Sequence, residues 1–142
     1  MFDTSHIHPM LVHFPIALVV FGFIADVASL YFKKEAFLSK MGTYLLIVGT
    51  LSALATWLSG VLFTAEMSGS AGQVKETHEL FAFITIIILV ITATLRLYLL
   101  IGKKDNSNLK WVAFILYGLA TISVSLTGFF GGTLVYSYMI PI

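Results

Sequence analysis

The sequence predicts an all-α membrane protein: an up-and-down bundle of four transmembrane helices in one domain of 142 residues. Three observations carry this prediction. Hydrophobic residues make up 58% of the chain and charged residues 11%, whereas a soluble domain has roughly 25% charged residues. Four apolar runs are long enough to cross a bilayer, which takes about 20 residues. Short polar segments separate these runs, so consecutive helices should pack antiparallel.

The four spans are expected at residues 9–31, 41–65, 77–101 and 111–137. The first should begin at Pro9, because proline suits the first helical position and disfavours helix in the residue before it. Residues 66–76 are small and polar and are expected to form a loop. The last run is longer than a bilayer requires, and Gly131-Gly132 should loosen its end.

Lysine and arginine are distributed unevenly between the two ends of the predicted bundle. One end carries seven of the eight: Lys33, Lys34, Lys40, Arg96, Lys103, Lys104 and Lys110. The other end carries only Lys75. The positive-inside rule therefore places both termini and residues 66–76 on the outer side, which is the periplasmic side of an inner membrane. All four histidines then share the outer face.

The composition excludes several classes of site. The chain has no cysteine, which excludes disulfides, thiolate metal sites, iron–sulfur clusters and covalent c-type haem. Histidine and carboxylate remain as the strong metal ligands. Basic residues are few and lie at span ends, so no nucleic-acid partner is expected.

The stretch from His6 to Ala17 holds three of the four histidines and two of the three prolines. Pro15 cannot donate a hydrogen bond to the carbonyl of Leu11, so that carbonyl is left free or the helix bends beside His13. Imidazoles gathered at a helix entrance, beside a free backbone acceptor, indicate a functional site.

His13 and His78 each lie near the outer end of a predicted span, at similar depth on parallel helices. Two neutral imidazoles facing each other across a bundle are suitable axial ligands for a b-type haem. His8 is the expected substitute or neighbouring partner. Lys75 is the only outer cation available to haem propionates. The favoured function is therefore electron transfer in the membrane.

Two alternatives stay open. His6, His8, His13 and His78 would also suit a copper, zinc or iron site. In the other alternative the imidazoles bind only backbone carbonyls and water, and the chain is a structural subunit of a larger membrane complex. No nucleophile or acid–base pair indicates an enzyme. The partners compatible with these hypotheses are the lipid bilayer, a redox protein or quinone, and a second copy or a larger complex.

Three weaker patterns complete the sequence evidence. Asp26 and Arg96 lie near the inner ends of their spans and would suit an ion pair, although we expect Arg96 to extend to the inner surface instead. Small residues recur at steps of three and four in the second and fourth spans and favour close helix packing. They are Gly49, Ala53, Thr56 and Gly60 in the second span and Gly118, Thr121, Ser125, Gly128 and Gly132 in the fourth. The order Leu58-Ser59-Gly60 resembles Leu126-Thr127-Gly128, which hints at a repeat of two plus two helices.

The opening motif, residues 8–17, reads His-Pro-x-x-Val-His-Phe-Pro-Ile-Ala, and the fourth span ends on Gly-Gly-x-Leu-Val-Tyr. With a histidine opening the third span, these motifs resemble the bacterial family of predicted membrane proteins called domain of unknown function 2231, over essentially the whole chain. The His-Gly-x-Gly ending of relatives is absent here, where Ser137 and Tyr138 follow. Some relatives are joined to Rieske-type iron–sulfur domains, so the resemblance implies membrane electron transfer.

Overall fold

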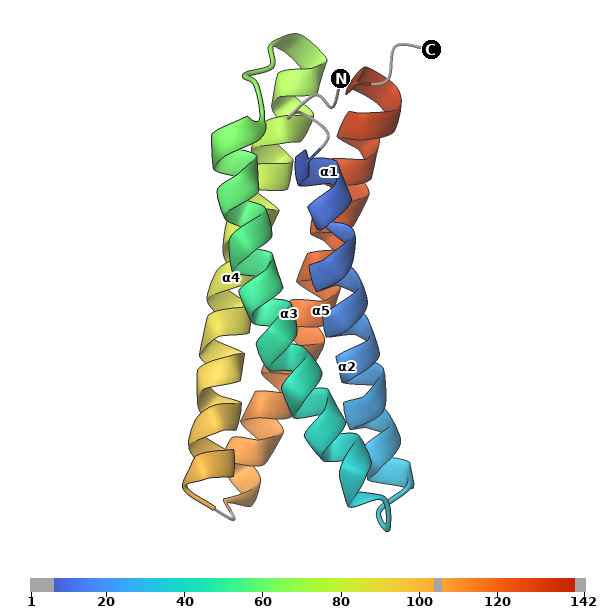
Figure 1. Ribbon diagram of the computed structural model, residues 1–142, viewed down its shortest axis with the longest axis vertical. Coiled ribbons are helices and arrows are strands. Elements are labelled where there is room, and N and C mark those ends of the chain that lie inside the picture. Colours follow the sequence, from blue (N-terminus) through green and yellow to red (C-terminus); the bar gives the residue numbers. More distant parts are fainter. Residues whose placement is uncertain (1–6, 104–105, 140–142) are drawn as a thin grey trace.

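The computed structural model describes residues 7–103 and 106–139 and is helical apart from short connections (Figure 1). Its elements are α1 (Ile7–Leu11), α2 (His13–Tyr31), α3 (Ala36–Phe63), α4 (Gly69–Ile101), α5 (Ser107–Leu134) and a π-helical turn η2 (Val135–Met139). With α1 and α2 taken together, four helices are long and apolar enough to cross a membrane. The predicted fold class is confirmed.

Three helices begin before the apolar runs that predicted them: α3 by five residues, α4 by eight and α5 by four. α4 begins at Gly69 and not at residue 77, so residues 69–76, expected as a loop, form its first two turns. Gly69 starts this helix from a φ of +66°, a conformation that glycine adopts readily. At the other end of the chain, α5 continues through Gly131 and Gly132 to Leu134 before the π-helical turn.

The first span begins at Ile7, before Pro9, and is interrupted at Val12, which separates α1 from α2. Pro15 leaves the carbonyl of Leu11 without its usual donor in the helix. The hydroxyl of Thr56 on α3 fills this role and donates to that carbonyl at 3.3 Å. The free carbonyl expected from the sequence therefore becomes an attachment point between the first and second spans.

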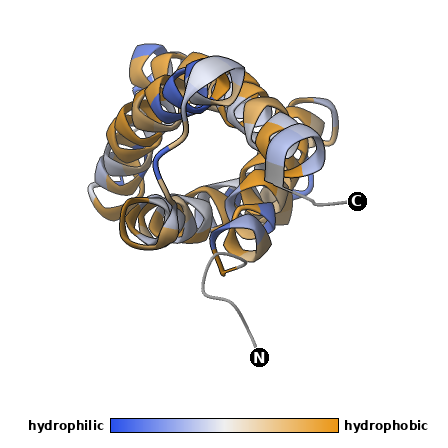
Figure 2. Ribbon diagram, turned by 90° about the horizontal axis from the view of Figure 1, so that it is seen from above, coloured by the Kyte–Doolittle hydropathy of each residue, from blue (hydrophilic) through white to orange (hydrophobic). Residues whose placement is uncertain are grey.

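The bundle consists of two antiparallel hairpins, α2–α3 and α4–α5, which diverge at the end that carries the two hairpin turns (Figure 1). Contacts within each hairpin are more extensive than the contacts of α2 with α5 and of α3 with α4. Seen from above, the helices form a ring and are mainly hydrophobic along their length (Figure 2). α1, the turn 64–68 and the C-terminal end of the last helix lie at the same end of the bundle (Figure 1).

Apart from Tyr117, the interior holds small and medium side chains, whereas most of the large apolar ones face outward. Val19, Leu46, Leu89 and Tyr117 are fully buried at the centre. Phe21 and many other large apolar side chains are exposed, as expected for a surface in contact with lipid. A few medium-sized side chains, small residues and Tyr117 therefore make up the buried contacts between the helices.

The stripe of small residues predicted in the second span is confirmed, and the one in the fourth span is only partly correct. On α3, Gly49 packs against Val19, and Ala53 is buried. On α5, Ser125 is exposed and Gly132 has open space around it. The buried face of α5 instead includes Ala120, Ser123 and Val124, so it is turned relative to the predicted stripe.

Candidate functional site

A cavity of about 490 Å³ lies at the end of the bundle that carries residue 7 and the turn 64–68. All four spans contribute to its lining, which includes His8, His13 and His78. Thr56 and Gly60 of α3 line one side, and Thr127 and Gly131 of α5 line another. Three of the four histidines singled out in the sequence therefore border one cavity; His6 lies outside the described residues.

The ring of His8 is oriented by α3. Its Nδ1 lies 3.0 Å from the carbonyl oxygen of Thr56 and 2.9 Å from Oγ of Ser59. A carbonyl oxygen can only accept, so Nδ1 of the neutral ring carries the proton. The Ser59 hydroxyl donates to the same Thr56 carbonyl at 2.6 Å, which leaves its lone pairs free to accept from His8.

The ring of His78 is held in the same way by α5. Its Nδ1 donates to the carbonyl oxygen of Thr127 at 3.0 Å. In the part of the chain that the structure describes, Nε2 of neither His8 nor His78 has a hydrogen-bond partner. Each neutral ring therefore presents an unprotonated Nε2 with a free lone pair.

The imidazole that packs against His78 is that of His8. The two ring centres lie 6.2 Å apart and the ring planes are inclined by 78°. His13, expected from the sequence to face His78, lies on an exposed part of α2 at the border of the cavity. Among the described residues, no three histidine or carboxylate side chains come together as a metal-binding group.

A glycine lies against each imidazole. A Cβ atom on Gly60 would lie 3.0 Å from Cε1 of His8, and one on Gly131 would lie 3.0 Å from Cε1 of His78. Such a contact is tight enough that the ring would have to move. Both helices thus lack a side chain at the point where an imidazole crosses them.

The contacts of the two histidines show which residues of the two hairpins correspond to each other. His78 follows His8 by 70 residues, while Thr127 follows Thr56, and Gly131 follows Gly60, by 71. The register suggested by the sequence, in which Gly60 corresponds to Gly128, is therefore wrong, because Gly131 is the equivalent residue. The arrangement of two plus two helices is correct. Each hairpin contributes one histidine and the backbone carbonyl that orients it.

Lys75 lines the same cavity and is bound by two carboxylates. Its Nζ lies 3.0 Å from Glu79 and 3.3 Å from Glu66, and its side chain is 11% exposed. Glu79 therefore neither orients the ring of His78 nor lies in the first turn of α4, because it pairs with Lys75 and the helix begins at Gly69.

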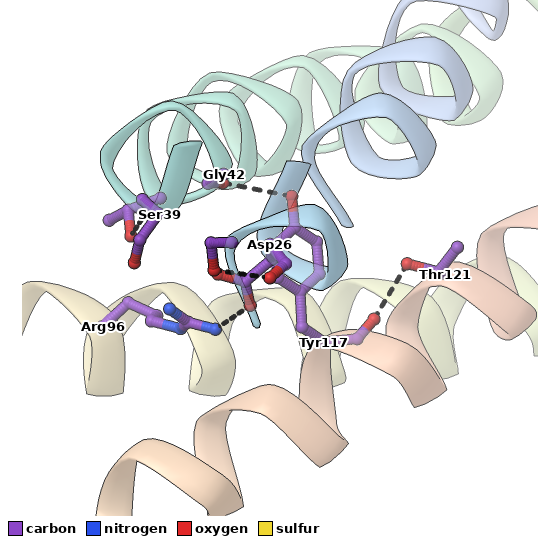
Figure 3. Close-up of polar contacts among 8 residues, drawn as sticks. Asp26, Ser39, Gly42, Arg96, Tyr117 and Thr121 are labelled. Carbon is purple, nitrogen blue, oxygen red and sulfur yellow. Dashed lines mark hydrogen bonds and ion pairs between the residues drawn. The ribbon is translucent and has the colours of Figure 1, made fainter. Parts of the chain in front are cut away.

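The opposite end of the bundle contains a buried ion pair. The guanidinium of Arg96 on α4 pairs with the carboxylate of Asp26 on α2 (Figure 3). Asp26 and Arg96 are separated by 70 residues, the same interval as His8 and His78. The expectation that Arg96 extends to the inner surface is wrong, because a buried carboxylate across the bundle binds it instead.

Tyr117 of α5 completes this layer of the bundle (Figure 3). Its hydroxyl donates to the carbonyl oxygen of Gly42 on α3 at 3.2 Å. The hydroxyl also fills the space above Gly22 on α2, where any Cβ would overlap it. The Tyr117 side chain thereby links α5 to two other helices, α2 and α3, and the sequence analysis did not single it out.

The fold and its cavity define a multi-pass helical membrane protein made of two hairpins that meet around a pair of histidines. The chain belongs to the family of predicted membrane proteins DUF2231, which matches residues 4–142. The resemblance seen in the sequence motifs is thereby confirmed. No curated protein and no solved structure matches the chain.

Proposed function

We propose that this protein is a b-type cytochrome of the bacterial inner membrane, which binds one haem in the outer cavity and transfers electrons. His8 and His78 are the proposed axial ligands. The observation that carries the proposal is a pair of neighbouring imidazoles, one from each hairpin. The Nδ1 atom of each ring is hydrogen-bonded to a backbone carbonyl oxygen.

The hydrogen bonds of the two rings support a role as ligands. Histidines that bind metals usually donate their second ring N–H to a carbonyl or carboxylate, which fixes the tautomer and the ring orientation. Thr56 and Thr127 supply such carbonyls for His8 and His78. Both Nε2 atoms are thereby left as acceptors beside the cavity.

The spacing of the rings agrees with a shared metal centre. An imidazole nitrogen binds first-row metals at about 2.0–2.1 Å, so two rings on opposite sides of one ion have centres about 6.2–6.4 Å apart. The observed separation between His8 and His78 is 6.2 Å. A cavity of about 490 Å³ lies within the usual range for ligand pockets, about 300–1,000 Å³.

The donor set favours haem over a bare ion. A zinc or copper site takes three or four protein ligands, whereas haem iron needs only axial ligands from the protein. The described residues bring two histidines together and no third ligand. The copper or zinc alternative would have to recruit His13 from the cavity border or His6, which lies outside the described residues.

The chain itself would bind, orient and shield the cofactor. Bound haem supplies a one-electron redox couple, and the surroundings of the ligands adjust its potential. Gly60 and Gly131 keep α3 and α5 close to the two imidazoles. Lys75 is the single lysine or arginine on the cavity lining, and Glu66 and Glu79 already neutralise it. We therefore expect haem propionates to point toward water.

Visible spectroscopy tests the proposal. Protein purified from a host with ample haem should show the sharp bands of a low-spin haem on reduction, with about one haem per chain. His8→Ala and His78→Ala should each abolish the bands or leave five-coordinate iron. Added imidazole should restore six-coordinate iron in both variants. His13→Ala is the matched control and should keep the six-coordinate spectrum, because His13 does not face His78.

Three results would contradict the proposal. A colourless protein that carries copper or zinc would favour the metal-site alternative. A protein with neither haem nor metal would favour a structural subunit of a larger membrane complex. A haem that is lost in His13→Ala but kept in His8→Ala would show that the ligands are assigned wrongly.

A further inference from the structure

A second cavity lies at the opposite end of the bundle, where the two hairpins diverge (Figure 1). Its volume is about 690 Å³, and all four spans contribute to its lining. Asp26 and Arg96, which form the ion pair described above, border this cavity. Its lining shares no residue with the lining of the histidine cavity, so the second cavity is a separate place in the fold.

Arg96 presents a hydrogen-bond donor to this cavity that the described part of the chain leaves unused. Its Nη2 binds Asp26 (Figure 3), whereas its Nε is buried and has no hydrogen-bond partner among the described residues. Arginine and a carboxylate commonly form two parallel hydrogen bonds, but here Nε takes no part in the pair. A buried donor without a partner needs an explanation, such as a bound water or ligand. An acceptor oxygen of a ligand in the second cavity would satisfy this N–H group.

The buried part of the lining carries no net charge, because Asp26 and Arg96 neutralise each other. The two lysines of the lining belong to the turn after α4 and to the first turns of α5. Lys103 is exposed in that turn, and Lys110 is already engaged by an interaction within the chain. An anion beside Arg96 would also meet the carboxylate of Asp26. The polar groups therefore favour a neutral ligand with an acceptor oxygen.

The rest of the lining indicates a ligand with a flat ring and an apolar tail. Trp111 and Phe114 of α5 lie edge to face, with ring centres 5.6 Å apart, and such rings pair favourably with a further aromatic or flat ring. Leu30 and Leu99 add aliphatic surface, and the helices that carry them are long and apolar enough to cross a membrane. A mostly apolar lining with a few placed polar groups is typical of pockets for small molecules.

We propose that the second cavity binds a lipid-soluble quinone. One ring carbonyl accepts the hydrogen bond from Nε of Arg96, the ring lies against Trp111 and Phe114, and the tail extends between the hairpins into the bilayer. A quinone is neutral and flat, and it is apolar apart from its oxygens, so it matches the charge, the aromatic surface and the free donor of the lining. The proposal concerns binding at this cavity and does not depend on whether the histidine cavity holds haem.

The two tryptophans allow a direct test, because quinones quench tryptophan fluorescence at short range. Trp111 lines the second cavity and Trp57 lines the histidine cavity, so Trp57→Phe and Trp111→Phe each leave one reporter. Each variant is placed in nanodiscs of phosphatidylcholine and titrated with decylubiquinone. Quenching of Trp111 should level off at about one quinone per chain. Quenching of Trp57 should rise only in proportion to the quinone dissolved in the bilayer.

Substitutions in the Trp57→Phe background then locate the site. Arg96→Lys keeps a cation for Asp26 but removes the Nε donor, so the affinity should fall about ten-fold or more, the usual contribution of a hydrogen bond from a charged group. Leu30→Phe narrows the cavity without changing the ion pair and should also weaken binding, which keeps the test decisive if Arg96→Lys does not fold. Leu51→Phe is the matched control, because Leu51 is also an exposed leucine but lies outside both linings. It should leave the affinity unchanged.

The proposal fails on any of three results. Quenching of Trp111 that rises only in proportion to the dissolved quinone, as for Trp57, would show that the cavity does not bind quinone. An affinity unchanged by Leu30→Phe, or by a folded Arg96→Lys variant, would place the bound quinone elsewhere. Displacement of the quinone by an equal mole fraction of dioleoylglycerol, a neutral lipid with ester carbonyls and no ring, would assign the cavity to glycerolipids.

Discussion

At the scale of single residues, the histidines show what sequence spacing can and cannot predict. The sequence identified the outer cluster and His78 as one of the pair. It paired His78 with His13 because each seemed to lie one turn inside an apolar run. The structure pairs His78 with His8, because α4 begins at Gly69 and the chain is interrupted at Val12. Span ends inferred from hydropathy therefore gave the wrong depth.

The sequence contained one signal for the pairing of His8 with His78 and of Asp26 with Arg96. Asp26 follows His8 by 18 residues, and Arg96 follows His78 by the same interval. Equal spacing on two parallel helices places both pairs at matching depths. The sequence analysis did not compare these two intervals, and it therefore expected Arg96, near the end of a span, to extend to the membrane surface.

The ion pair leads to a prediction on stability. Asp26→Leu or Arg96→Leu leaves one charge buried without its partner and should destabilise the bundle by about 3–5 kcal/mol. The double Leu variant removes both charges and should be more stable than either single variant. Unfolding in mixed micelles with increasing dodecyl sulfate measures all three free energies. Single variants as stable as the unsubstituted protein would contradict a buried, coupled pair.

At the scale of elements, the existence and order of the four membrane-spanning helices were predictable from the sequence. Their end residues and their buried faces were not. Apolar runs locate the membrane-crossing part of a helix but carry no information on polar turns beyond it, such as residues 69–76. The buried face of α5 was also misjudged. Tyr117 lies at the centre of this face, and the missing side chain of Gly22 on α2 leaves room for its hydroxyl.

The contact between Tyr117 and Gly22 gives a prediction at this scale. Gly22→Ala forces a methyl group into the Tyr117 hydroxyl and should cost about 1–3 kcal/mol of unfolding free energy. Tyr117→Phe removes that oxygen, so the double variant should recover part of the loss; Leu45 also lies close to the new methyl. The same micelle titration measures this double-mutant cycle.

Gly132→Ala is the matched control for this cycle, because no atom lies within 4 Å of its new methyl group. It should change the stability little or raise it slightly, since alanine favours helix over glycine. A Gly22→Ala variant as well tolerated as Gly132→Ala would mean that α2 and α5 do not approach as the structure shows.

At the scale of the whole molecule, the fold class followed from composition and hydropathy alone. A chain with four apolar runs joined by short turns has few alternatives to an up-and-down bundle, because the bilayer admits only structures that satisfy their backbone groups internally. The division into two hairpins was suggested by a weak repeat. Its register became visible only through the equivalent contacts of Thr56 and Thr127 with the two histidines.

The orientation in the membrane is a prediction from charge, and the absence of cysteine makes it simple to test. Ser70→Cys and Lys34→Cys each place one exposed thiol at opposite ends of the bundle. In intact spheroplasts, a membrane-impermeant maleimide should label Ser70→Cys and spare Lys34→Cys until the cells are lysed. The reverse pattern would place the histidines in the cytoplasm.

The 70-residue interval shared by the two pairs also bears on how such a bundle can be assembled. Two identical hairpins around a two-fold axis would set every residue opposite its own copy. Neutral imidazoles tolerate that arrangement, as His8 and His78 illustrate. At the level of Asp26 and Arg96, the same arrangement would bring together two carboxylates or two guanidinium groups, which repel each other in a medium of low dielectric constant. Each half of this chain is therefore complementary to the other half and incompatible with a copy of itself.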